Sequence, residues 1–117
     1  MIELALKTDE VMTGHRFEGE IRWSSDAATR VIAAAEWQAV AFHGTKRGVG
    51  RATAYVPKRG ENHGAFPVRM LIPHEGPMSY EGEVIQIRWS LWVRIERAGP
   101  DEFAKVDFRV VPRKLGR

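Results

Sequence analysis

The sequence predicts an all-β fold, an antiparallel β-sandwich or barrel, from three observations. Several segments alternate apolar and polar residues with a period of two, turn-forming residues separate them, and their apolar rows are rich in β-branched and aromatic side chains. The clearest segment is 84–98, in which one row holds Ile85, Ile87, Trp89, Leu91, Val93 and Ile95. This row predicts a long strand with one buried face.

The other elements follow the same rule in shorter segments. Alternation predicts strands over 2–6, 17–23 and 66–72, and a strand over 103–111 with Val106, Phe108 and Val110 on one face. The turn residues Gly99-Pro100-Asp101 join this last strand to 84–98 as a hairpin. Further turns are expected at 13–14, 24–26, 44–45, 59–62 and 73–77.

Residues 27–42 fit two structures. Their alanine content favours a helix, which Asp26 could cap. Their alternation, with Val31 and Trp37 in the same row, favours a strand. Periodicity alone leaves both open.

Length and composition indicate one domain, residues 1–112, followed by a basic tail, 113–117. The absence of cysteine excludes disulfides and thiolate metal sites. No apolar run approaches the ~18 residues that a membrane span needs. The start, MIELALKTDE, lacks the basic and then apolar pattern of a signal peptide, so we expect a cytoplasmic protein.

Catalysis and cofactors are not expected. The four histidines, at 15, 43, 63 and 74, stand in or beside turns without the spacing of metal ligands, and Ser79 lacks the glycine context of a nucleophile elbow. GTKRGVGR, at 44–51, matches no phosphate-binding fingerprint and is typical of a hairpin tip. We therefore predict no enzyme, no metal and no cofactor. A hydrolase whose site is assembled from scattered His and Glu residues stays as a remote alternative.

Two surfaces remain as candidate binding sites. The outward row of the long strand carries Arg88, Trp92 and Arg94, and an outward tryptophan either packs at the edge of the sandwich or contacts a protein partner. A second cluster, Lys46, Arg47 and Arg51, is expected in a solvated loop that could bind an anion. The balance of 18 Lys and Arg against 15 Asp and Glu is too even to favour nucleic-acid binding.

A proline-rich stretch and a Ser-Tyr-Glu-Gly sequence precede the long strand. In order, these elements are Phe66-Pro67, Pro73, Pro77 and residues 79–82. Within residues 65–94 this pattern resembles the arrestin-like family, and GHRFEGEI at 14–21 is similar to the family's glycine-bounded early strand. The resemblance covers about residues 2–112. It implies a single immunoglobulin-like, arrestin-like β-sandwich and favours a strand over 27–42.

The proline and Ser-Tyr-x-Gly cluster has an architectural interpretation. We expect Pro73 and Pro77 to hold a crossing between the sheets, Tyr80 to bury its ring as a tyrosine corner, and Gly82 to adopt a backbone angle that other residues avoid. The phosphate-sensing and clathrin-binding motifs of arrestins have no counterpart here, so no functional residue is carried over.

The resemblance implies a non-catalytic adaptor or scaffold that binds a protein partner through a sheet edge or a sheet face. A homodimer through a sheet edge is equally compatible with this fold. The alternative is a domain that binds nucleic acid or another polyanion through the basic cluster and the tail. The sequence does not name the partner.

Overall fold

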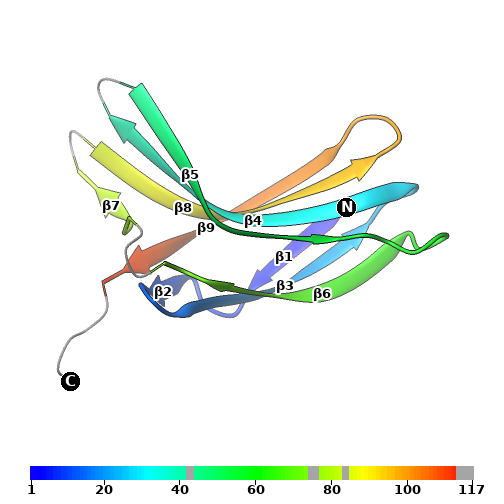
Figure 1. The fold of residues 1–117 in the computed structure, drawn as a ribbon, viewed down its shortest axis with the longest axis horizontal. Coiled ribbons are helices and arrows are strands. Elements are labelled where there is room, and N and C mark those ends of the chain that lie inside the picture. Colours follow the sequence, from blue (N-terminus) through cyan, green and yellow to red (C-terminus); the bar gives the residue numbers. More distant parts are fainter. Residues whose placement is uncertain (42–43, 74–76, 83–84, 113–117) are drawn as a thin grey trace.

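The computed structural model describes residues 1–41, 44–73, 77–82 and 85–112, which form two β-sheets packed face to face (Figure 1). These residues contain strands and no helix, so the predicted β-sandwich is confirmed. The strands are β1 (Ile2–Leu6), β2 (Glu10–Met12), β3 (Arg16–Ser24), β4 (Ala28–Ala41), β5 (Gly44–Tyr55), β6 (His63–Leu71), β7 (Tyr80–Glu81), β8 (Ile85–Arg97) and β9 (Glu102–Val111).

The smaller sheet has the order β1-β3-β6 and the larger sheet the order β2-β9-β8-β4-β5, with the short β7 also pairing with β8. Every pair is antiparallel except β2 with β9, which is parallel. In Figure 1 the larger sheet is bent, so that its outer face is concave and one end of β4, β5 and β8 extends beyond the smaller sheet.

The core lies between the sheets and is built from the predicted apolar rows. Trp89, Leu91, Val93 and Ile95 of β8 are fully buried, which confirms the alternation over this part of the long strand. Ile85 and Ile87, predicted in the same row, are not buried: Ile85 is 41% exposed and Ile87 is half-buried. Across this interface the Phe17 ring of β3 stacks on Phe108 of β9, with ring centroids 4.3 Å apart. Aromatic pairs in this geometry add to the stabilisation from buried apolar area.

The alanine-rich segment is a strand, β4, which lies in the interior of the larger sheet between β8 and β5. It pairs with β8 from Ala28 to Ala41 and with β5 from Val31 to Ala41. The ladders on both edges override the local preference of alanine for a helix, because strand preference depends mainly on cross-strand packing. Ala33 and Ala35 are buried among the larger side chains of the core.

Three local predictions are wrong. The basic segment expected in a loop is part of β5, and the turn predicted at 44–45 also lies in this strand, which pairs with β4 from Gly44 onward. The turn predicted at 59–62, in contrast, is confirmed, and β6 begins directly after it, at His63. Tyr80 is 57% exposed, so it does not form a buried tyrosine corner. The predicted tail, His43 and His74 lie outside the described residues.

Gly82 is explained by packing and not by its backbone angle. Positive φ angles occur at Gly14, Gly44, Gly60 and Gly99 among the described glycines. At Gly82 an added Cβ would lie 2.6 Å from the Cε1 atom of Tyr80, because the tyrosine ring folds over the glycine.

Candidate interaction surface

The outward row of β8 occupies the concave outer face of the larger sheet. Arg88, Trp92 and Arg94 lie in this row, opposite the row that fills the core. Trp92 is half-buried, whereas Arg88 is largely exposed. The structure brings Trp92 and Arg94 together and places Arg88 four residues away, toward the other end of the strand.

Trp92 forms the centre of an aromatic and cationic cluster. The guanidinium carbon of Arg94 lies 5.6 Å from the centre of the Trp92 ring, and the Phe103 ring of β9 lies 5.6 Å away on a neighbouring strand. Phe103 is 60% exposed. We call Trp92, Arg94 and Phe103 the aromatic cluster. Trp92 therefore packs against Phe103 and still presents an apolar surface with a cation beside it.

Glu96 fixes the position of Arg94. Its carboxylate accepts two hydrogen bonds from Arg30, at 3.0 and 2.9 Å, and one from Arg94, at 2.7 Å. The hydrogen bond from Arg30, followed by the charges of the two arginines, lowers the pKa of the Glu96 carboxyl. Glu96 therefore stays ionised near neutral pH and holds the Arg94 guanidinium beside Trp92.

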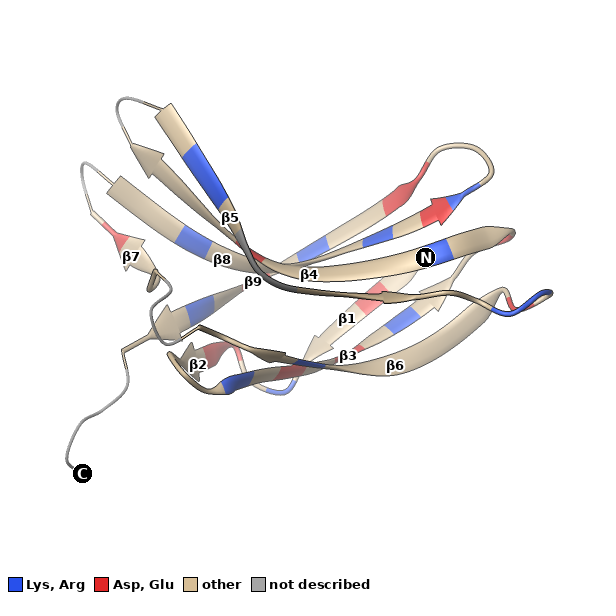
Figure 2. Ribbon diagram, viewed as in Figure 1, with Lys and Arg blue, Asp and Glu red and all other residues tan. Residues whose placement is uncertain are grey.

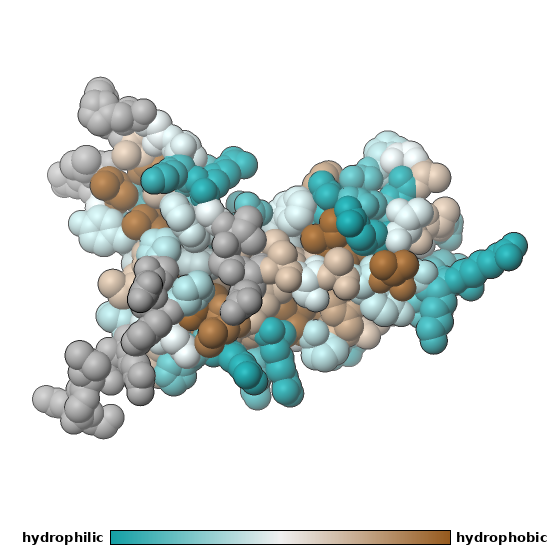
Figure 3. Space-filling model, in the orientation of Figure 1, coloured by the Kyte–Doolittle hydropathy of each residue, from teal (hydrophilic) through white to brown (hydrophobic). Residues whose placement is uncertain are grey.

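A hollow lies next to the aromatic cluster. In Figure 3 the upper outline of the molecule dips between the projecting end of β4 and β5 and the β8–β9 hairpin. The hollow has a volume of about 220 Å³, and its lining includes Glu36, Gln38, Arg47, Ser90, Trp92 and Lys105. Its polar and charged walls suit the rim of a protein contact more than an apolar small molecule.

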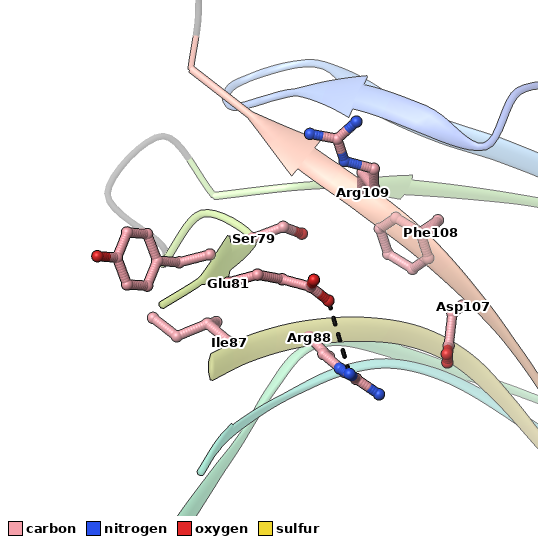
Figure 4. Close-up of a pocket in the computed structure, with 8 residues that line it drawn as sticks. Ser79, Glu81, Ile87, Arg88, Asp107, Phe108 and Arg109 are labelled. Carbon is pink, nitrogen blue, oxygen red and sulfur yellow. Dashed lines mark ion pairs between the residues drawn. The ribbon is translucent and has the colours of Figure 1, made fainter. Parts of the chain in front are cut away.

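Arg88 belongs to a separate notch where β9 diverges from β8 (Figure 4). This notch has a volume of about 560 Å³, and its charged lining consists of Glu81, Arg88, Asp107 and Arg109. The Arg88 guanidinium lies 3.6 Å from the Glu81 carboxylate. Both side chains are largely exposed, so this pair contributes little to stability.

The segment 77–81 closes one side of the notch and is held by three hydrogen bonds in addition to the pairing of β7 with β8. The Trp89 indole Nε1 donates to the Pro77 carbonyl at 2.8 Å. The Ser79 amide donates to the Val110 carbonyl, and the Val110 amide donates to the Ser79 Oγ, both at 2.8 Å. We call residues 77–81 the strap. Ser79 thus ties the strap to β9.

Two of the predicted anion-binding residues, Lys46 and Arg47, do not converge. Successive residues of a strand point to opposite faces, so Lys46 and Arg47 lie on opposite sides of β5, while Arg51 pairs with Ala35 beyond a bulge. Gly48 accommodates the Trp37 ring, because an added Cβ would lie 2.4 Å from the indole Cε2 atom. The glycine therefore serves packing. Anion binding by this segment stays a prediction.

The described residues contain no group of three or more His, Cys, Asp or Glu side chains able to hold a metal ion. Among the described residues no helix is long and apolar enough to cross a membrane. The two described histidines, His15 and His63, are exposed.

Sequence reasoning missed three residues of this surface: Arg30, Glu96 and Phe103 as partners of Trp92 and Arg94. Alternation did place Phe103 opposite the buried row of its strand, but its neighbour across the sheet depends on the hairpin register. That register pairs Arg94 with Phe103 and Trp92 with Lys105. A count outward from the turn at 99–101 would have paired Ala98 with Glu102, whereas the structure pairs Ile95 with Glu102, so the turn residues alone did not indicate this register.

Fold and surface together define a two-sheet β-sandwich with an aromatic and cationic patch on its outer sheet face. No family model and no curated protein matches the sequence. Among solved structures the fold is similar to that of Spo0M, a sporulation control protein from Bacillus subtilis, with a TM-score of 0.66 over 93% of this chain and 14% sequence identity. The chain spans 48% of Spo0M, about half its length. At this identity the similarity establishes the arrestin-like β-sandwich as a fold.

Proposed function

We propose that the chain is a non-catalytic protein-interaction domain of the arrestin-like family, an adaptor that acts in the cytoplasm. Its contact surface is the outer face of the larger sheet around the aromatic cluster. The observation that carries this proposal is the exposed Phe103 ring beside Trp92 and Arg94. Tryptophan, aromatic residues and arginine are the side chains most enriched among the energetically important residues of protein interfaces.

The order of the cluster supports the same function. Because Glu96 already holds Arg94 over Trp92, little side-chain freedom is lost when a partner covers the cluster. The fold of Spo0M supports a regulatory role by analogy, since that protein is named for the control of sporulation.

The test is a pull-down with tagged protein from a nuclease-treated lysate, washed at low and at high salt. The variants are Trp92→Ala and Phe103→Ala. Leu71→Ala is the matched control, because Leu71 is also an exposed apolar residue but lies on the smaller sheet. We expect one stoichiometric protein that survives both washes, is retained by Leu71→Ala and is lost with both cluster variants. Retention by all variants would show that the contact surface lies elsewhere.

A second function, polyanion binding, is favoured by one observation. The segment 44–51 carries three cationic residues and no acidic residue, and Lys46 and Arg47 are exposed (Figure 2). This function predicts that affinity for DNA falls steeply as salt rises, because neutralised phosphates release counterions. A flat salt response would reject it.

A further inference from the structure

The free edge of β5 differs from the other sheet edges of the described structure. The larger sheet ends at β5 and β2, and the smaller sheet at β1 and β6. Two of these edge strands are short, five residues in β1 and three in β2, and β6 contains Pro67. In contrast, β5 has twelve residues and no proline. Short strands and proline are the usual means by which proteins prevent pairing at an edge.

The first half of β5 is also accessible and basic. It belongs to the end of the larger sheet that extends beyond the smaller sheet, and its basic segment lies on this projection (Figures 1 and 2). Lys46 and Arg47 lie on opposite faces of this edge. An added strand would likewise direct successive side chains to opposite faces.

We propose that the edge of β5 from Gly44 to Val49 accepts an extended acidic segment of the partner protein as an additional strand. This inference rests on the proposed function and adds the chemistry of the partner. Two adjacent acidic residues in the added strand would face Lys46 and Arg47, one on each face of the sheet. Backbone hydrogen bonds would supply affinity, and the two charge pairs would supply specificity.

A second copy of this chain fits the edge poorly. Pairing of β5 with β5 brings together two segments that each carry three cationic residues and no acidic residue between 44 and 51. Like charges on directly opposed strands are destabilising. Charge therefore selects a different, acidic strand as the occupant.

The experiment titrates the full chain with a fluorescent, blocked peptide of sequence Thr-Val-Glu-Glu-Val-Thr and records anisotropy and amide hydrogen exchange. Matched peptides replace both glutamates by glutamine, or carry N-methyl groups on alternate amides. Protein variants are Lys46→Glu and Arg47→Glu. Arg16→Glu, an exposed position on β3, is the control with the same change of charge. A melting curve of each variant verifies folding.

We expect the parent peptide to bind and to protect β5 amides from exchange. Each β5 variant should weaken binding by about fivefold to tenfold, as should either peptide change, while Arg16→Glu binds like the wild type. If a variant does not fold, the two modified peptides tested on the wild type still decide the question.

Four results would overturn the inference: no binding of the parent peptide, equal binding of the N-methylated peptide, tighter binding of DNA than of the peptide, or concentration-dependent dimerisation through β5. A partner that is captured through Trp92 while the peptide fails to bind would leave the proposed function intact and reject the edge. If the peptide binds but no captured partner depends on Trp92, the edge of β5 is supported as a strand-binding site and the proposed contact surface around the aromatic cluster is rejected.

Discussion

Replacement of Trp89 by phenylalanine measures how strongly the strap is held. Trp89 is fully buried, and the smaller ring leaves a cavity on the order of 40 Å³, a loss of about 1 kcal/mol before lost contacts are added. The change also removes the hydrogen bond to the Pro77 carbonyl, which costs about 1–2 kcal/mol more. We therefore expect Trp89→Phe to lower the free energy of unfolding by about 2–4 kcal/mol.

Trp23→Phe is the matched control. Trp23 is 2% exposed, and its buried Nε1 has no hydrogen-bond partner among the described residues. In Trp23→Phe the same loss of ring volume is offset, because the change also removes a buried N–H group that has no hydrogen-bond partner among the described residues. We therefore expect the free energy of unfolding to fall by only about 0–1 kcal/mol.

The assay is thermal unfolding of both variants followed by circular dichroism. For a domain of 117 residues, 1 kcal/mol corresponds to about 4 °C in Tm, so Trp89→Phe should melt roughly 8 °C below Trp23→Phe. Equal shifts, or a larger shift for Trp23→Phe, would refute the reasoning, because they would mean that the indole hydrogen bond to the strap contributes nothing.

Further predictions test the packing at two glycines and the charge at one carboxylate. Gly48→Ala should cost about 1–3 kcal/mol by urea unfolding, and Trp37→Ala in the same chain should remove most of that cost, since the added methyl meets the Trp37 ring. Gly82→Ala should cost less, because the exposed Tyr80 ring can turn away, and Tyr80→Phe should change stability by no more than about 0.5 kcal/mol. Because the pKa of Glu96 is lowered in the folded protein, its carboxylate stabilises the fold above the usual carboxyl pKa of 4.5, and this contribution is lost as pH falls through the folded pKa. The difference in Tm between the wild type and Glu96→Gln should therefore hold from pH 7 to 5 and shrink toward pH 3.

The sequence alone predicted those strands that pair with a neighbour in the chain or that alternate apolar and polar residues over many positions. The β8–β9 hairpin follows from the row through Trp89 and the turn at 99–101, and the structure confirms both. Residues 27–42 were ambiguous because alanine satisfies either structure, and only the pairing of both edges of β4 decides between them. The basic segment was assigned to a loop because its glycines suggested flexibility, whereas one of them is needed to fit the Trp37 ring.

The surface was predictable as a row but not as a cluster. Alternation placed Arg88, Trp92 and Arg94 on one face, yet it could not show that Glu96 binds Arg30 and Arg94 together, since that contact joins residues 66 positions apart. Tyr80 shows the converse error. The Ser-Tyr-x-Gly motif suggested that the Tyr80 ring is buried, but the ring lies at an exposed end of the sheet. The local sequence does not show whether another segment covers a ring at that position.

The proline and Ser-Tyr-x-Gly cluster has a mechanical explanation in this chain. Beyond Phe108, β9 no longer pairs with β8, and its residues from Arg109 to Val111 pair with β2. This divergence would leave the backbone N–H and C=O groups along that edge of β8 without a neighbouring strand. The strap fills that position: β7 pairs with β8, Ser79 pairs with Val110, and the Pro77 carbonyl accepts from Trp89. The motif residues Pro77, Ser79, Tyr80 and Glu81 thus close the sandwich where its sheet divides. Because these residues are committed to architecture, a similar motif in another chain indicates the fold and says nothing about its partner. For this chain, we propose that the aromatic cluster and the basic edge of β5 are the residues that determine a partner.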